Sequence, residues 1–142
     1  MIFRVSSKAL KAKCLTALQL LTRMKAADDN GIAQCVTCGK KDHYKNMQGG
    51  HFIPRGHTKW CLDQRNVWVQ CPYCNLWGMK SGGTAAQAYT LFMIDQVGQD
   101  FVDEMIRTKS EPVKLYKSDY EEILAELNEQ LRQQEQRLNG AN

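Results

Sequence analysis

Four of the six cysteines in this 142-residue chain form two Cys-x-x-Cys pairs, and this feature restricts the possible folds most. Residues 35–38 read CVTC, residues 71–74 read CPYC, and 32 residues separate the pairs. Each pair has the spacing of a zinc knuckle, whose turn directs two thiolates at one metal. Gly39 after the first pair favours such a turn. We therefore predict a structural Zn²⁺ held by Cys35, Cys38, Cys71 and Cys74.

Two other uses of paired cysteines are alternatives. A disulfide framework needs an oxidising compartment, and the N-terminal sequence lacks the apolar core of a signal peptide. A thioredoxin-like redox site would use one pair on a βα unit. Cys14 and Cys61 are expected to be spare thiols, with Cys61 as a reserve ligand. No stretch reaches the length of a membrane span, so we expect a cytoplasmic protein without a membrane partner.

Periodicity and turn residues divide the chain into three predicted segments. Residues 1–31 form a basic N-terminal helix, capped by Ser6 or Ser7 and ending near residues 24–27. Residues 32–98 form a core of short strands and turns, including a strand over residues 66–71, followed by a helix that ends at Gly98.

Residues 99–142 form a C-terminal helical extension. A short helix precedes Pro112, and a capping box at Ser118–Glu121 starts the last helix. The leucine stripe of that helix serves internal packing or, alternatively, a homodimer. The polar end of the chain, residues 132–142, is expected to fray.

The net charge of +4 conceals an uneven distribution. Residues 1–80 carry 13 Lys/Arg and 4 Asp/Glu, a net charge of +9, whereas residues 81–142 carry a net charge of −5. A basic front half with three tryptophans suits a polyanion such as DNA. A solubilising mixture of surface charges is the alternative.

Three stretches of the sequence resemble the HNH nuclease pattern. They are GGHFIPR (residues 49–55), LDQRNVWVQCPYCN (residues 62–75) and MKSG (residues 79–82). More narrowly, residues 20–127 resemble the phage NinG/Rap recombination endonuclease family. The resemblance implies an α+β fold with a small zinc-stabilised ββα-metal core, HNH-like and treble-clef-like, between flanking N- and C-terminal helices.

The resemblance also implies roles for individual residues. His51 matches the general base, Asn66 the asparagine that orients it, and Asn75 the ligand of a catalytic Mg²⁺ or Mn²⁺. A histidine can accept a proton near neutral pH, and an amide oxygen suits a hard cation. Arg55 follows His51 in the same loop and is expected to hold the scissile phosphate or to stabilise the transition state, with a solvated arginine as the alternative. The expected DNA contacts are Lys80, His57, Lys59 and Trp60, with metal ligation as an alternative for His57.

Gly50 departs from the HNH pattern, in which many enzymes place an aspartate directly before the histidine. Asp42 and Asp63 are the nearest carboxylates that could replace it, and otherwise Asn75 holds the cation with water and phosphate oxygens. The two glycines, Gly49 and Gly50, are expected to leave room for a phosphate backbone.

The predicted function is a Mg²⁺-dependent DNA endonuclease. The resemblance implies phage recombination intermediates, such as Holliday junctions and D-loops, in the cytoplasm of a bacterial host. One alternative is a non-catalytic zinc-knuckle DNA-binding or adaptor protein. Another is a protein–protein module that uses the acidic C-terminal helices.

Overall fold

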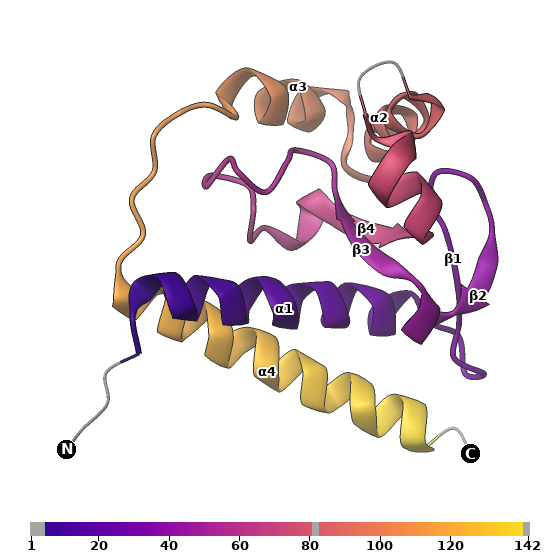
Figure 1. Ribbon diagram of the computed structural model, residues 1–142, viewed down its shortest axis with the longest axis horizontal. Coiled ribbons are helices and arrows are strands. Elements are labelled where there is room, and N and C mark those ends of the chain that lie inside the picture. The colour runs from indigo at the N-terminus through magenta and orange to yellow at the C-terminus, as the bar shows by residue number, and fades with distance from the viewer. Residues whose placement is uncertain (1–4, 81–82, 141–142) are drawn as a thin grey trace.

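The computed structural model describes residues 5–80 and 83–140 and shows an α+β fold in which helices surround two small sheets (Figure 1). The helices are α1 (Ser7–Ala26), α2 (Thr84–Val97), α3 (Gln99–Thr108) and α4 (Lys117–Gly140). The strands are β1 (Ile32–Gln34), β2 (Lys41–His43), β3 (Gln48–His51) and β4 (Val67–Gln70). The short turns are the 3-10 helices η1 (Tyr44–Asn46) and η2 (Gln64–Asn66) and the π-helix η3 (Cys74–Gly78).

Both sheets are antiparallel pairs of strands. β1 pairs with β2, and the first Cys-x-x-Cys pair lies in the connection between them. β3 pairs with β4 in a register that places Gly50 opposite Trp68 and His51 opposite Val67. The strand predicted over residues 66–71 is therefore confirmed as β4. The short η3 follows the second Cys-x-x-Cys pair, and the longer helix α2 begins at Thr84.

α1 and α4 run side by side in the same direction beneath the β3–β4 pair (Figure 1). Ser6 caps α1 by accepting a hydrogen bond from the backbone of Ala9 at 3.1 Å, as predicted. The first core contains buried residues of α1, β4 and α4, namely Leu10, Cys14, Ala17, Leu18, Leu21, Val67, Tyr120 and Leu127. Leu124 and Leu131 also pack against it. The leucine stripe of the last helix therefore serves internal packing.

α2 and α3 cover the other side of the β3–β4 pair (Figure 1). The second core contains Ile53, Trp60, Tyr89, Met93, Val102 and Met105. α2 ends before Gly98, whose φ of 90° is a conformation that favours glycine, so the predicted end of this helix is confirmed. Tyr89 and Met93 of α2 are fully buried, whereas Leu91 is 70% exposed.

α4 differs from the prediction at both ends. It begins at Lys117 rather than after Ser118, and Asp119 Oδ2 accepts a hydrogen bond from the backbone N–H of Tyr116 at 2.7 Å. The polar end does not fray within the described residues, because α4 continues to Gly140. Arg137 holds this end by donating to the carbonyls of Met24 at 2.7 Å and Ala27 at 3.0 Å.

None of the helices within residues 5–80 and 83–140 combines the length and the apolar character required to span a bilayer.

Candidate metal centre and histidine cleft

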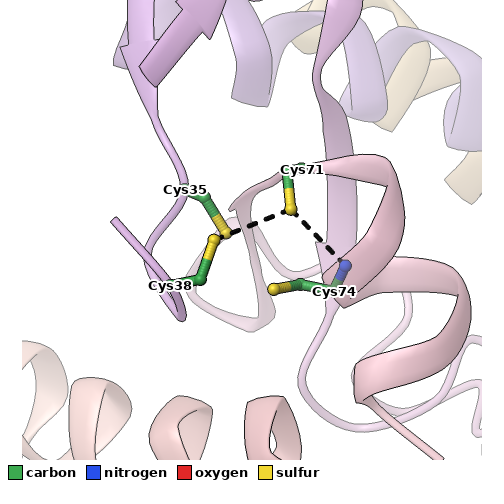
Figure 2. A group of neighbouring side chains, drawn as sticks. All are labelled: Cys35, Cys38, Cys71 and Cys74. Atoms are coloured by element: carbon green, nitrogen blue, oxygen red, sulfur yellow. Dashed lines mark hydrogen bonds between the residues drawn. The ribbon is translucent and has the colours of Figure 1, made fainter. Parts of the chain in front are cut away.

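The four cysteines of the two pairs converge at one point between β1, β4 and η3 (Figure 2). Their sulfur atoms all lie within 4.8 Å of one another, and Cys38 Sγ lies 3.7 Å from Cys71 Sγ. Four sulfurs bound to Zn²⁺ at about 2.3 Å in a tetrahedron would be about 3.8 Å apart. The cluster could therefore hold a structural metal such as zinc, and the predicted set of four ligands is brought together.

Local turns explain why the first pair points its sulfurs inward. Gly39 has a φ of 81°, and its N–H donates to Cys35 O at 2.9 Å, which closes the turn. Burial alone would raise the pKa of Cys35, but hydrogen bonds from Thr37 and from nearby backbone amides outweigh it and lower the pKa to about 6. Burial raises the pKa of Cys74 to about 12. The cluster thus favours a thiolate at Cys35 even before a metal binds.

A second site lies in a cavity of about 610 Å³ between α1, the loop after β3, and η3. His51, Arg55 and Asn75 all line this cavity, which we call the histidine cleft. Residues of α1, including Thr16 and Gln19, form its opposite wall. The fold therefore brings together three of the predicted site residues, of which the first and the last, His51 and Asn75, are 24 positions apart in sequence.

His51 is held at one ring nitrogen. Its Nε2 lies 2.9 Å from the carbonyl oxygen of Cys61, and a carbonyl only accepts hydrogen bonds. In the neutral ring, Nε2 therefore carries the proton and Nδ1 has a free lone pair. Burial lowers the pKa of His51, the contact with Cys61 O opposes this, and the charge of Arg55 lowers it further. These effects favour the neutral imidazole.

Asn66 fixes the loop that follows His51. The side chain is fully buried, and its Nδ2 donates to Ile53 O at 2.9 Å and to Trp60 O at 3.1 Å. Its Oδ1 accepts from Ile53 N at 2.7 Å. All of these contacts are to backbone, so Asn66 orients the loop and has no access to a substrate. The residue was predicted among the catalytic residues, and its burial restricts it to the positioning part of that prediction.

Asn75 lies where η3 meets β3. Its Nδ2 donates to Gln48 Oε1 at 2.7 Å, which directs Oδ1 toward Gly50. A Cβ at Gly50 would lie 3.0 Å from Asn75 Oδ1 and would collide with Gln70 Oε1. Position 50 therefore has no space for an aspartate, because the side chain of Gln70 already fills that space.

The family model for the bacteriophage lambda NinG protein matches residues 7–137, which include both cysteine pairs and the histidine cleft. This chain belongs to the NinG family. No curated protein and no solved structure gave a significant match. The match covers nearly the whole chain and includes α1, most of α4 and the cysteine cluster.

The other carboxylates considered as metal ligands do not line the histidine cleft of this NinG-family chain. Asp63 accepts hydrogen bonds from Arg65, including one from Nη2 at 2.7 Å. Asp42 accepts from His43 N at 2.7 Å and from Asn46 at 3.1 Å. Both carboxylates are occupied by local contacts. Cys61, the proposed reserve ligand, lies outside the four-cysteine cluster and contributes its carbonyl to His51 instead.

The two glycines before His51 both have close neighbours inside the protein. A Cβ at Gly49 would meet Gln19 Cα at 3.1 Å, so Gly49 allows α1 to lie directly on β3. Gly50 lies against Gln70, as described above. Gly49 also lines the histidine cleft, so the expectation that the two glycines leave room for a phosphate backbone stays a prediction.

The residues predicted to contact DNA do not lie together in the structure. Trp60 is only 6% exposed and donates through Nε1 to Thr108 at 3.2 Å, so its predicted contact with DNA is wrong. Lys59 forms an ion pair with Glu111 at 2.6 Å, and His57 lines a groove beside Lys109–Lys114 rather than the histidine cleft. Lys80 is exposed, and its Nζ lies 4.3 Å from the ring centre of Trp77.

Tyr89 is a site residue that the sequence analysis missed. Its hydroxyl donates to Gly50 O at 2.7 Å and accepts from Trp68 N at 3.0 Å, so it bridges β3 and β4 directly before His51. Burial raises the pKa of Tyr89, which keeps the hydroxyl protonated as a donor. The apolar pattern of α2 marked this region as core but gave no sign of the hydrogen-bonding role.

Proposed function

We propose that this NinG-family protein is a metal-dependent DNA endonuclease in which His51 is the general base. The observation that carries the proposal is the contact between His51 Nε2 and Cys61 O, which leaves Nδ1 as the acceptor in a cleft shared with Arg55 and Asn75. A base of this kind can remove a proton from a water molecule that attacks phosphorus. The P–O bond on the other side of the phosphorus then breaks.

The remaining cleft residues suit the charges of that reaction. Arg55 is exposed at the cleft and offers a guanidinium that can bind two oxygens of a phosphate. Asn75 would hold a Mg²⁺ or Mn²⁺ ion, which when bound stabilises negative charge on the leaving oxygen. Asn66 and Tyr89 keep the backbone around His51 in place from the buried side.

The fold supports the proposal through the order of its elements. β3 ends in His51, β4 leads to the second cysteine pair, and η3 carries Asn75. This order is the one expected of a ββα-metal core, with η3 in place of the start of a longer helix. α1 forms one wall of the cleft and carries Lys8, Lys11 and Lys13, which could contact the DNA backbone.

The substrate class that we propose is branched recombination DNA. The NinG family provides the bacteriophage context, and the resemblance described above provides recombination intermediates as substrates. The comparison is direct: four-way-junction, D-loop and linear duplex DNA are incubated with equal amounts of protein in Mg²⁺, in Mn²⁺ or in EDTA. Preferential cleavage of the branched substrates is expected, with no cleavage in EDTA.

The variant His51→Ala tests the base. We expect cleavage to fall by about 10²–10⁴-fold, the usual contribution of a general base, while DNA affinity and zinc content stay near wild type. His57→Ala is the matched control, because His57 lies in a different groove. Cleavage is measured under single-turnover conditions. Equal cleavage rates for wild type and His51→Ala would exclude His51 as the base. If the wild-type protein binds DNA but does not cleave it, a non-catalytic DNA-binding protein would be favoured instead.

A further inference from the structure

Gln70 is a buried polar side chain that the proposed reaction does not yet use. It ends β4 directly before Cys71 and is 0% exposed. Its Oε1 has no hydrogen-bond donor among residues 5–80 and 83–140. Buried amide oxygens nearly always have a partner in folded proteins, so an unpaired one points to a ligand.

The cysteine cluster determines which way the amide of Gln70 points. Gln70 Nε2 lies 3.2 Å from Thr37 Oγ1, and Thr37 Oγ1 lies 3.3 Å from Cys35 Sγ. A hydroxyl can donate one hydrogen bond and accept others at the same oxygen. Thr37 Oγ1 can then accept from Gln70 Nε2. This chain of hydrogen bonds directs Gln70 Oε1 away from Thr37 and toward Gly50.

Asn75 Oδ1 is directed to the same place by a separate contact. Its Nδ2 donates to Gln48 Oε1 at 2.7 Å, and its Oδ1 lies 3.0 Å from the position of a Cβ on Gly50. Gln70 Oε1 lies closer still to that position. Two amide oxygens from different elements thus lie beside Gly50, and Asn75 also lines the histidine cleft.

We infer that Gln70 Oε1 and Asn75 Oδ1 are two protein ligands of one hard divalent cation, Mg²⁺ or Mn²⁺, bound beside Gly50. Such cations prefer oxygen ligands and keep several waters, so two protein ligands are sufficient. The inference rests on the proposed function for the role of that cation, but the binding itself does not. The amide oxygen of Gln70 takes the place of the aspartate that position 50 cannot accommodate.

The test measures how tightly Mn²⁺ binds to the zinc-loaded protein in the absence of DNA. The electron paramagnetic resonance signal of free Mn²⁺ reports how much of the ion stays unbound. Gln70→Met keeps the shape of the side chain and removes the oxygen, and we expect it to weaken binding at least about tenfold. Asn75→Ala is expected to have an effect of the same size. Gln19→Met is the matched control, because Gln19 lines the cleft but packs on Gly49.

Two further variants keep the inference testable if Gln70→Met loses zinc or unfolds. Thr37→Val leaves Gln70 in place but removes the hydroxyl that orients it, and we expect weaker Mn²⁺ binding by protein whose full zinc loading has first been checked by atomic absorption. In the double variant Gly50→Asp/Gln70→Ala, the introduced carboxylate has the space that Gln70 vacates. This double variant should bind Mn²⁺ at least as tightly as wild type, whereas Gln70→Ala alone should not.

The outcomes separate the inference from the proposed function. Wild type that binds no Mn²⁺, a Gln70→Met protein with wild-type affinity, or a double variant as weak as Gln70→Ala would each overturn the cation site. His51→Ala should bind Mn²⁺ normally and yet fail to cleave. Normal Mn²⁺ binding by a wild-type protein that cleaves no DNA would refute the endonuclease but leave the cation site standing.

Discussion

At the scale of single residues, the two ring nitrogens of His51 have different surroundings. Nε2 is bound to the carbonyl of Cys61, whereas the ring lines an open cleft beside Arg55. Burial and the nearby guanidinium disfavour the imidazolium, so both lower the pKa of His51 below 6.5. A base with a lowered pKa is weaker, but it stays neutral and ready to accept a proton over a wider pH range.

This difference predicts the pH dependence of cleavage. The neutral ring is the active form, so the single-turnover rate should fall only as the pH drops through the lowered pKa of His51, below 6.5. Arg55→Gln removes a charge that lowers this pKa, so its acid limb should move to higher pH, whatever happens to the rate itself. NMR titration of the His51 Cε1 proton checks the same shift directly. An acid limb at or above pH 6.5 in wild type would contradict the prediction.

The same pKa shift affects stability with a defined sign. Between the lowered pKa of His51 and 6.5, the unfolded chain binds more protons than the folded chain. The neutral form of His51 therefore contributes to the free energy of unfolding in full above pH 6.5. This contribution is lost as the pH falls from 6.5 through the lowered pKa of His51.

At the scale of elements, the segment between the cysteine pairs depends on its two ends. β3 and β4 have only four residues each, and the loop between them is held by the buried amide of Asn66. A metal bound by all four cysteines would fix both ends of this segment at one point. Val36 N also donates to Val69 O at 3.0 Å, which joins the first knuckle to β4.

Cys71→Ser should therefore lose metal and fold together. Binding of structural zinc typically supplies about 10–16 kcal/mol of folding free energy, more than the whole stability of a small domain. We expect zinc content near zero and loss of the cooperative unfolding transition, measured by atomic absorption and circular dichroism. Cys14→Ala is the control, because Cys14 is equally buried but lies in the α1–α4 core. A Cys71→Ser protein that keeps both zinc and fold would exclude Cys71 as a ligand.

At the scale of the whole molecule, the two terminal helices are joined along their length. Cys14 Sγ lies 3.4 Å from Tyr120 O near the start of α4, and Arg137 near its end contacts the last carbonyls of α1. A cation at the C-terminal end of a helix also interacts favourably with the helix dipole. α4 thereby supports α1, which forms one wall of the histidine cleft.

Arg137→Gln should lower the free energy of unfolding by about 1.5–3 kcal/mol, the usual value for hydrogen bonds made by a charged group. Arg132→Gln is the matched control, because Arg132 lies on the same helix in an exposed ion pair with Glu129. Such an exposed pair contributes little to stability. Urea unfolding followed by circular dichroism compares the two. Equal losses for both variants would mean that the contact with α1 adds nothing to stability.

The sequence alone determined the features that depend on neighbouring residues. The spacing of Cys35, Cys38, Cys71 and Cys74 predicted the four-sulfur cluster, because each pair acts through its own turn. The helical spacing of apolar residues predicted α1, and the glycine at position 98 predicted the end of α2. One error was local, because the capping contact of α4 comes from Asp119 rather than from Ser118. The other was not, because a polar C-terminal sequence does not reveal that Arg137 has a distant partner.

Only the tertiary structure decided what surrounds His51 and Gly50. The carbonyl of Cys61, the hydroxyl of Tyr89 and the amide of Gln70 reach this point from positions 10 to 39 residues away, and none belongs to a recognisable spacing. The ring of Trp60 can likewise be buried because its Nε1–H donates to Thr108 Oγ1, which lies 48 positions away in sequence. Such contacts depend on how separate elements pack in space, and a linear pattern records only the residues along one element.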